Sequence, residues 1–291
     1  MKIACVTYEN ENYASSIKNE DVVLVQYLQE KGIDIKIEVW TDSDVKWETY
    51  DAIIVKSPWD YHYKLDQFNT WLEMLKYQNI RILNPYDRIK WNSDKHYLQH
   101  IENAGLKIIP TFWLKKNEKP DLLKYFKLLS TEKIVIKPSI SASALNTFVH
   151  NQDDIIEAIL KIEQLLQEQD FIIQPFMNQI QTIGEWSFIF FNGEFSHSVL
   201  KTPKSGDFRV QSSFGGVAHL KSAPNQLIQY AKKYVEIFAK DCLFTRVDGL
   251  DIDGQFFLME LELIEPYLFL LHDKNSFERF YKALKQLLNI N

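Results

Sequence analysis

The segment 245–262 reads TRVDGLDIDGQFFLMELE and sets charged residues into two apolar runs. Its Asp-Gly dipeptide at 253–254 is a strong turn signal, so the segment predicts a β-hairpin. Because strand side chains alternate between two faces, Glu260 and Glu262 are expected together on one face. The residues expected on the opposite, buried face are Phe257, Met259, Leu261 and Leu263. Adjacent carboxylates repel each other and are costly to bury without a partner.

Two loops are compatible with this hairpin. A two-residue turn would place Asp248 opposite Met259 and toward the core. A three-residue loop at 252–254 would place Asp248 opposite Leu258 instead, with a glycine at the position where such loops favour a bulge. We favour the three-residue loop because an unpaired carboxylate is expensive to bury. It gathers four charged side chains on one face: Arg246, Asp248, Glu260 and Glu262.

Three carboxylates in one cluster require compensating positive charge, of which Arg246 supplies one unit. Mg²⁺ prefers oxygen ligands and shares them with substrate phosphates. The alternative is a solvated strand face with surface ion pairs. Since Phe256 and Leu258 would lie beside the carboxylates, simple exposure explains this face less well. The pattern therefore predicts a metal site formed by Asp248, Glu260 and Glu262.

Cations at separate positions complement these carboxylates. Lys137 ends the apolar pattern IVIKP, where a lysine either snorkels to solvent or meets an anion. Lys95 is expected in the first turn of a helix spanning 93–105, where the macrodipole disfavours a cation. Lys201 ends a hairpin strand, and Arg209 lies in a glycine-containing stretch that we interpret as a candidate lid. Such a set of carboxylates and cations is typical of phosphoryl transfer.

The chain as a whole predicts three lobes and a fold class that combines α/β with α+β. Residues 1–90 alternate strand and helix patterns, which indicates a small parallel sheet with crossover helices. Residues 91–180 indicate an α+β unit. Residues 181–291 indicate a mostly antiparallel lobe that begins with a hairpin turning at Asn192-Gly193. The residues expected on one face of that hairpin are Trp186, Phe188, Phe190, Phe195, His197, Val199 and Lys201.

Composition excludes several classes of protein. The 291-residue chain has a net charge of −6, so no global field attracts nucleic acid or an anionic membrane surface. Two distant cysteines, no signal-peptide pattern and no apolar run of membrane-spanning length predict a cytoplasmic, soluble protein. The sequence contains neither a P-loop motif nor a dinucleotide-binding fingerprint, and it lacks a hydrolase elbow.

A second candidate site follows the strand pattern that ends in KSPW. Trp59, Asp60 and Tyr61 would lie at the carboxyl end of a parallel strand, where open α/β sheets present their ligands. We expect them to shape a pocket for a small substrate. The alternative is a packed loop in which Trp59 seals the core. If Asp60 binds substrate, its natural partner is an ammonium group, which would suit an amino-acid-like molecule.

These motifs, in this order, resemble the ATP-grasp superfamily, including D-alanine–D-alanine ligase and glutathione synthetase. The hairpin 245–262 looks like the family's metal-binding motif, and IVIKP looks like its phosphate-binding strand. The resemblance covers about residues 90–291, and the first ninety residues look like the small α/β domain that precedes the grasp. Within the superfamily, KSPWDYH, WNSDK and ELELIEP look like a subgroup that contains the D-cycloserine-forming ligase.

The resemblance implies an ATP-dependent carboxylate–amine ligase that acts through an acyl phosphate on a small amino-acid-like substrate. One or two Mg²⁺ ions, with Mn²⁺ as an alternative, would be held by the carboxylates of the hairpin. The residues expected to contact ATP are Lys95, Lys137, Gln174, Phe176 and Glu185. The expected catalytic residues are Arg246, Arg209 and Lys201. No nucleic-acid or membrane partner is expected, and the resemblance leaves monomer and homodimer open.

Two departures from the family pattern leave alternatives open. Glu262 stands where relatives carry Asn, and the loop 139–147 reads SISASALNT without the family's glycines. A catalytically reduced ATP-binding protein with a regulatory or scaffolding role is therefore one alternative. A structural or interaction protein with a solvated acidic face is the other.

Overall fold

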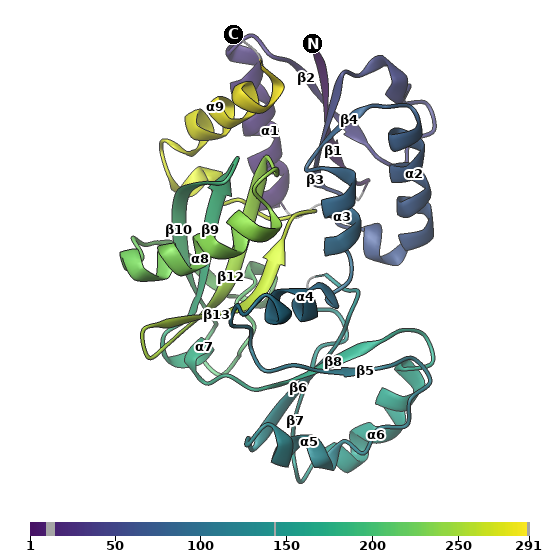
Figure 1. Cartoon of the computed structure of the whole chain (residues 1–291), viewed down its shortest axis with the longest axis vertical. Coiled ribbons are helices and arrows are strands. Elements are labelled where there is room, and N and C mark those ends of the chain that lie inside the picture. The colour runs from purple at the N-terminus through teal and green to yellow at the C-terminus, as the bar shows by residue number, and fades with distance from the viewer. Residues whose placement is uncertain (10–14, 143, 290–291) are drawn as a thin grey trace.

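The computed structural model describes residues 1–9, 15–142 and 144–289, and its strands form three sheets (Figure 1). Each sheet draws its strands from one of the three predicted ranges. The parallel sheet lies at the upper right of Figure 1, the five-stranded sheet at the left and the smaller antiparallel sheet at the bottom. Among the helices of the described residues, none has the length and apolar character needed to cross a membrane.

The N-terminal sheet is parallel, as predicted, with the strand order β2-β1-β3-β4. Its strands are β1 (Lys2–Thr7), β2 (Asp34–Val39), β3 (Ala52–Ser57) and β4 (Arg81–Leu83). Alternate β1 residues pack into two clusters, with Ile3 facing helix α1 (Ser15–Glu30) and Ala4 facing helix α2 (Leu65–Tyr77). The sheet is therefore covered on both faces, as parallel sheets require.

The central sheet is antiparallel and has the order β5-β8-β6-β7. Its strands are β5 (Phe112–Leu114), β6 (Lys133–Pro138), β7 (Phe148–Asn151) and β8 (Phe171–Pro175). Two helices, α5 (Leu123–Leu128) and α6 (Ile155–Leu165), pack onto one face of it through a common apolar cluster. The other face is left toward the rest of the molecule.

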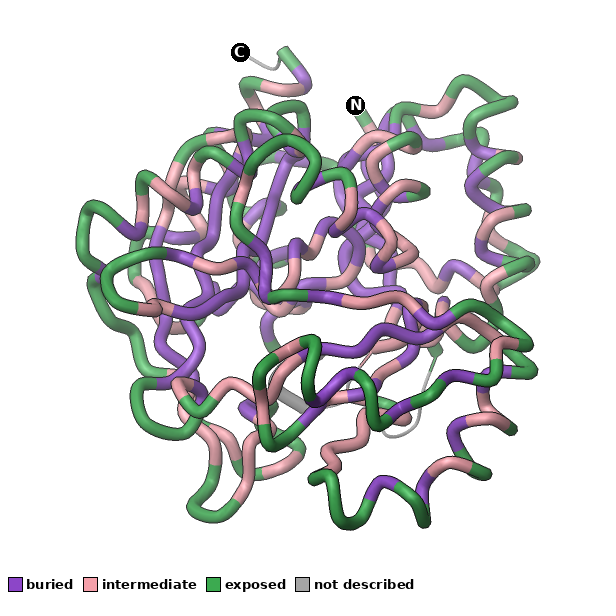
Figure 2. The backbone as a smooth tube through the Cα atoms, turned by 60° about the horizontal axis from the view of Figure 1, so that its bottom comes forward, coloured by how far each residue is buried: buried purple, intermediate pink, exposed green. Residues whose placement is uncertain are grey.

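The C-terminal sheet is also antiparallel and has the order β11-β10-β9-β12-β13. Its strands are β9 (Glu185–Phe191), β10 (Glu194–Thr202), β11 (Val217–Leu220), β12 (Phe244–Ile252) and β13 (Gln255–Glu262). Helix α8 (Asn225–Phe238) covers one face, and the short helix α7 (Gln179–Thr182) leads into the sheet. Figure 2 shows buried backbone running through the middle of the molecule, and β9 and most of β12 are buried whereas β11 is mostly exposed.

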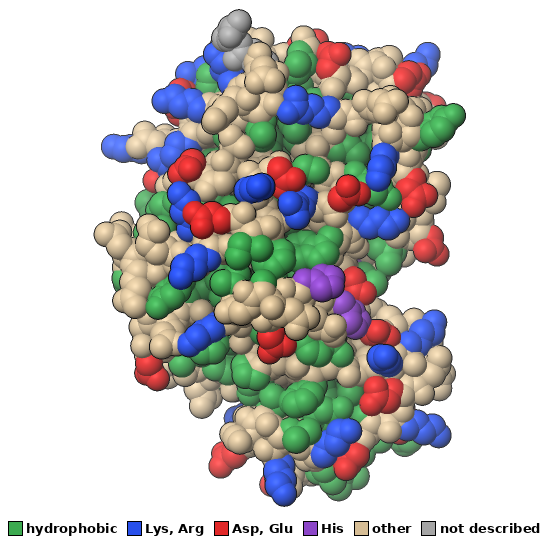
Figure 3. Space-filling view, viewed as in Figure 1, with side chains coloured by type: hydrophobic (Ala, Val, Ile, Leu, Met, Phe, Trp, Pro, Cys, Tyr) green, Lys and Arg blue, Asp and Glu red, His purple; other side chains and the backbone are tan. Residues whose placement is uncertain are grey.

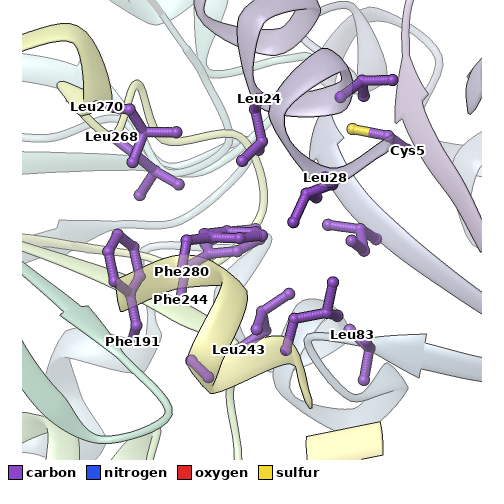
Figure 4. Close-up of a cluster of buried hydrophobic side chains, with 14 of the residues drawn as sticks. Cys5, Leu24, Leu28, Leu83, Phe191, Leu243, Phe244, Leu268, Leu270 and Phe280 are labelled. Atoms are coloured by element: carbon purple, nitrogen blue, oxygen red, sulfur yellow. The ribbon is translucent and has the colours of Figure 1, made fainter. Parts of the chain in front are cut away.

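One apolar cluster joins the two ends of the chain. Leu24 and Leu28 of α1 pack with Phe280 of the last helix, α9 (Ser276–Leu288), and with Phe191 and Phe244 of the C-terminal sheet (Figure 4). Because this cluster spans two lobes, the N-terminal sheet and the C-terminal sheet form one continuous body.

Side chains from two helical segments satisfy the outer edge of β13. Asn92, at the end of helix α3 (Tyr86–Asn92), donates to the Leu261 carbonyl at 2.7 Å and accepts from the Leu263 amide at 2.9 Å. The hydroxyl of Tyr97, in helix α4 (Tyr97–Asn103), accepts from the Leu261 amide at 2.9 Å. An edge strand leaves backbone groups unpaired, so these contacts hold β13 in place.

His197 gives the fold a dependence on pH. Its buried ring contacts the Leu268 carbonyl through Nε2 at 3.0 Å, and the Ser196 hydroxyl through Nδ1 at 2.8 Å. Burial lowers the pKa of His197 to about 4, and Arg279 adds to the lowering. The unfolded chain binds this proton near pH 6.5. The stability that a neutral His197 contributes is thus complete above pH 6.5 and is lost as the pH falls toward 4.

We expect this loss to reach about 3 kcal/mol between pH 7 and pH 4. Urea unfolding at several pH values would measure it. His197→Gln keeps a side-chain donor for the Leu268 carbonyl but cannot titrate, so its free energy of unfolding should fall less steeply with acid. Equal pH slopes for the two proteins would contradict the assignment.

Candidate active site

The hairpin β12–β13 brings the predicted charged residues together by a different register from the one expected. Ile252 lies opposite Gln255, so the loop has two residues and the prediction of a three-residue loop is wrong. An extra residue, Met259, then forms a bulge that shifts the pairing by one position. The pairs beyond it are Asp248 opposite Glu260 and Arg246 opposite Glu262.

The bulge also corrects the expected faces of β13. Leu261 and Leu263 reach the core under α8, but Phe257 and Met259 pack in a separate cluster with Leu250. A strand alternates strictly only while its register holds, and the extra residue reverses the alternation. The four charged side chains still share one face, as predicted, but the two-residue turn and the bulge produce it together.

Arg246 and Asp248 form the centre of the site. Nε of Arg246 lies 3.1 Å from both carboxylate oxygens of Asp248, and Nη1 donates to the Tyr267 carbonyl at 3.0 Å. Nη2 also contacts Glu262. Burial opposes the ionisation of Asp248, but Arg246 and Lys201 outweigh it and lower the pKa of this carboxyl. The pair is therefore a fixed ionic unit at the bottom of the site.

Lys201 reaches the same carboxylate because β10 contains a bulge. The register shifts between Phe195 and His197, so Lys201 lies opposite Glu185 rather than on the aromatic face predicted for it. Its Nζ lies 2.5 Å from Glu185 and 2.8 Å from Asp248. The other residues that the bulge moves from the expected face are His197 and Val199. Burial and the nearby Asp248 act in opposite directions on Lys201, and its pKa is raised overall.

Lys95 enters the site from a turn, so its expected place in a helix is wrong. Ser93 ends α3 through a bond from its hydroxyl to the Lys90 carbonyl at 2.9 Å, and α4 begins only at Tyr97. In the turn between them, Nζ of Lys95 lies 3.0 Å from the Ser141 carbonyl and 3.3 Å from Glu260. The side chain is buried and ties the hairpin to the loop 139–147.

Lys137, at the end of β6, differs from Lys95, Lys201 and Arg246, each of which pairs with a carboxylate of the site. It makes no ion pair with any residue that the structure describes, and burial lowers its pKa, while the charge of Glu260 opposes that shift. A partly buried lysine without a partner is costly unless an anion arrives. Of the two readings given for Lys137, the structure therefore favours a lysine that awaits an anion.

These residues line one cavity of about 610 Å³ between the central and C-terminal sheets. One end is apolar, with Ile109, Ile180 and Val210 in its wall, and the other end is charged. The predicted residues that line it are Trp59, Lys95, Lys137, Gln174, Phe176, Glu185, Lys201, Arg209, Arg246, Asp248, Glu260 and Glu262. The surface is indented where the central lobe meets the rest of the molecule (Figure 3).

The predicted adenine and lid residues lie at the apolar end and the rim. Gln174 is buried, and its amide donates to Thr111 at 2.9 Å. Phe176 packs edge-on against Phe208 with ring centroids 5.9 Å apart. Arg209 pairs with Asp207 at 2.8 Å and lies over an aromatic ring, so its charge is compensated in this structure.

The predicted substrate residues divide between a second cavity and the core. Trp59 lines both the main cavity and a neighbouring one of about 580 Å³, which Asp60 also lines. Both oxygens of Asp60 are engaged at 2.7 Å, by the Trp40 indole and by Lys64. Tyr61 is buried in the N-terminal core against Phe68. Asp60 therefore offers no free charge to an ammonium group.

The donor set fits Mg²⁺ held jointly with phosphate and does not fit a cage made by protein alone. Every predicted ligand is engaged by a cation: Asp248 by Arg246, Glu262 by the same guanidinium and Glu260 by Lys95. Among the described residues, no three Asp, Glu, His or Cys side chains gather closely enough to hold an ion. Mg²⁺ commonly takes one or two carboxylates and completes its octahedron with phosphates and water.

Sequence reasoning missed two residues of this site. Ser187 donates to Asp248 at 2.6 Å, and its position two residues after Glu185 on β9 could have suggested it. Glu265 lines the main cavity just beyond β13, and strand alternation carries no information there because the strand has ended.

Comparison with known proteins identifies the family. A family model for the ATP-grasp domain of prokaryotic glutathione synthetase matches residues 107–269, which is more than half of the chain. The chain belongs to the ATP-grasp ligase family. A second model, for the N-terminal domain of D-cycloserine synthetase DcsG, matches residues 3–84 of this ATP-grasp ligase.

Relatives cover nearly the whole ATP-grasp ligase. The cycloserine biosynthesis protein DcsG of Streptomyces lavendulae is 24% identical over 284 residues, covering 91% of this chain and 92% of the relative. The crystal structure of D-cycloserine synthetase DcsG has a TM-score of 0.86 at 23% identity, covering 99% and 100% of the two chains. That of D-alanine–D-alanine ligase from Bacillus anthracis with ATP has a TM-score of 0.74 at 14% identity, covering 100% and 98%.

The family and fold predictions are thereby confirmed, including a parallel N-terminal sheet followed by two α+β lobes. As an ATP-grasp ligase, the protein is an enzyme that carries out ATP-dependent ligation, and ATP and Mg²⁺ are typical of its family.

Proposed function

We propose that this enzyme transfers the γ-phosphoryl group of ATP to a substrate carboxylate and then joins the resulting acyl phosphate to an amine. In the first step the carboxylate oxygen bonds to the γ-phosphorus, the bond to the β-phosphate oxygen breaks, and ADP leaves. In the second step the amine nitrogen bonds to the acyl carbon, the carbon–oxygen bond breaks, and phosphate leaves while the amine loses a proton. One observation carries the proposal: separate cations and carboxylates line the charged end of a cavity whose other end is apolar.

The nucleotide occupies this cavity lengthwise. Its adenine lies at the apolar end, where Gln174 offers an amide and Phe176 a ring edge. Lys95 and Lys137 neutralise the phosphates, and the unpaired state of Lys137 supports this role. Glu185, which pairs with Lys201, accepts a hydrogen bond from the ribose.

The charged end performs the transfer. Asp248, Glu260 and Glu262, together with the phosphates of ATP, would hold one or two Mg²⁺ ions, with Mn²⁺ as an alternative, and a bound metal would supply positive charge that offsets the charge of the phosphates. The guanidinium of Arg246 stabilises charge that develops on the transferred group, because its position is fixed in advance by Asp248 and the Tyr267 carbonyl. Arg209 at the rim closes over the acyl phosphate, together with Lys201, and excludes water.

The substrate is small and amino-acid-like. The relatives include enzymes named for cycloserine and for D-alanyl-D-alanine, which favours D-amino acids or their derivatives. Trp59 lines both the main cavity and its neighbour, and this second cavity offers room for a substrate beside the nucleotide.

A direct assay tests this function. The full chain with ATP, Mg²⁺ and a panel of D- and L-amino acids should release ADP and phosphate in equal amounts, and EDTA should abolish the release. Hydroxylamine should trap the acyl phosphate as a hydroxamate. ADP release without phosphate or hydroxamate would exclude the acyl phosphate. The absence of both ADP release and a thermal shift with ATP and Mg²⁺ would overturn the proposal.

A further inference from the structure

Glu265 is a carboxylate of the main cavity that forms no ion pair with a described residue. It lies three residues beyond Glu262, lines the cavity and is partly buried. It makes no hydrogen bond or ion pair with any residue that the structure describes, whereas each other carboxylate of the cavity has a cationic partner. Burial, together with Glu262 and Glu260, raises the pKa of Glu265.

The charges of the cavity leave Glu265 without a counterion. Its acidic side chains are Glu185, Asp248, Glu260, Glu262 and Glu265. Its basic side chains are Lys95, Lys137, Lys201, Arg209 and Arg246. Arg209 is bound to Asp207 outside the cavity, so four cations remain for five carboxylates. Burial without a cationic partner disfavours the ionised form of such a carboxyl group, and a cationic ligand would stabilise that form.

The surroundings of Glu265 suit an amine-bearing molecule. Trp59, Tyr267 and His272 line the same cavity, and aromatic faces attract cations. Nε1 of Trp59 and Nδ1 of His272 are buried without a hydrogen-bond partner among the described residues. Unpaired polar groups in the same cavity as a carboxylate that lacks an ion pair are typical of a site that awaits its ligand.

Two other features indicate where in the cavity this ligand would bind. Asp60, the residue first expected to meet an ammonium group, is already engaged by Trp40 and Lys64. Among the charges that act on Glu265 are those of Glu262, Lys95 and Arg246, which surround the place assigned to the transferred phosphoryl group. An amine bound at Glu265 would therefore lie close to the carboxylate that is activated.

We propose that Glu265 binds the ammonium group of the substrate, so that the enzyme selects molecules carrying a protonated primary amine. The inference rests on the proposed ligase function and names the substrate class of that same cavity. The carboxylate pairs with the ammonium, and the rings of Trp59 and Tyr267 flank it. A substrate with a hydroxyl in place of the amine leaves Glu265 uncompensated and is rejected.

The test compares the wild type with Glu265→Gln, which keeps the shape but removes the charge. The probe is whichever amino acid of the panel gives the fastest ADP release, alongside its 2-hydroxy acid analogue, such as D-lactate for D-alanine. We expect Glu265→Gln to raise KM for the amino acid about 10–100-fold and to leave KM for ATP within about twofold. Preference for the amino acid over the hydroxy acid should fall by a similar factor, and Glu265→Asp should restore part of it.

Glu194→Gln serves as the matched control, because Glu194 begins β10 at an exposed position and pairs with Lys232 on the surface. An unchanged KM for the amino acid in Glu265→Gln would overturn the inference. Turnover by the wild type would still support the proposed ligase function in that case. If the wild type releases no ADP with any amino acid, calorimetry measures the binding of the same panel to both proteins with ADP and Mg²⁺ present. An amino acid that binds the wild type but not Glu265→Gln would support the inference even though the ligase function fails. Equal binding by the two proteins, or no binding by either, would overturn it.

Discussion

Replacing Arg246 by lysine is expected to lower kcat about 10²–10³-fold while ATP still binds. Lysine keeps the positive charge but has no planar fork, so it cannot contact Asp248, Glu262 and the Tyr267 carbonyl together as the guanidinium does. Stabilisation of a transition state depends on groups that are already in position when charge develops. The loss should therefore fall on kcat, with little change in KM for ATP.

Arg88→Lys is the matched control for this prediction. Arg88 pairs with Asp241 at 2.9 Å in a partly exposed surface contact, and such pairs contribute little. Steady-state kinetics of both variants, together with a thermal shift with ATP and Mg²⁺, would separate a lost contact from a lost fold. A kcat within threefold of the wild type in Arg246→Lys, with the fold intact, would remove Arg246 from the catalytic groups.

The part of the site that follows from the alternation of side chains along a strand could be predicted from the sequence. Glu260 and Glu262 share a face because they are two residues apart, and no tertiary contact is needed to see this. Their partners across the hairpin depend on register, which a bulge at Met259 sets. A two-residue turn without a bulge would indeed turn the carboxylate of Asp248 toward the core. The bulge at Met259, rather than a longer loop, places Asp248 on the face of the other charged residues.

Other residues depend on contacts that local patterns do not contain. Lys201 was expected among aromatic side chains because nothing in its sequence marks the bulge of β10. Lys95 was expected in a helix because Ser93 resembles a helix start, but the serine ends the preceding helix instead. Glu265 lies past the end of a strand, and only the fold shows that it faces the cavity.

The segment that follows β13 links the site to the N-terminal lobe. Glu20 of α1 accepts from the amides of Leu268 and Leu270, each at 2.9 Å. Lys56 of β3 donates to the Pro266 carbonyl at 3.1 Å. This segment supplies the carbonyl that orients Arg246. Glu20 and Lys56 thus hold one wall of the site in place at the junction of two lobes.

Lys56→Met is expected to destabilise the protein by about 3–5 kcal/mol, because it removes a buried cation that pairs with the carboxylates of Glu20 and Asp21. Lys56 is fully buried, and its Nζ lies 3.1 Å from Glu20 and 3.2 Å from Asp21. Methionine fills a similar volume, so little of the loss comes from a cavity. Urea unfolding measures the change, and Lys90→Met, which breaks an exposed pair with Glu73, should cost no more than about 1 kcal/mol.

The pH dependence of this deficit separates charge from packing. Without Lys56 the pKa of the buried Glu20 carboxyl should rise further above its value in the unfolded chain, since burial already raises it and Lys56 opposes that shift. A raised pKa contributes stability at low pH that is lost as the pH rises. The deficit of Lys56→Met should therefore be smaller at pH 5 than at pH 8, and adding Asp21→Asn should recover part of it. A deficit that is constant across this range would mean that Lys56 contributes packing alone.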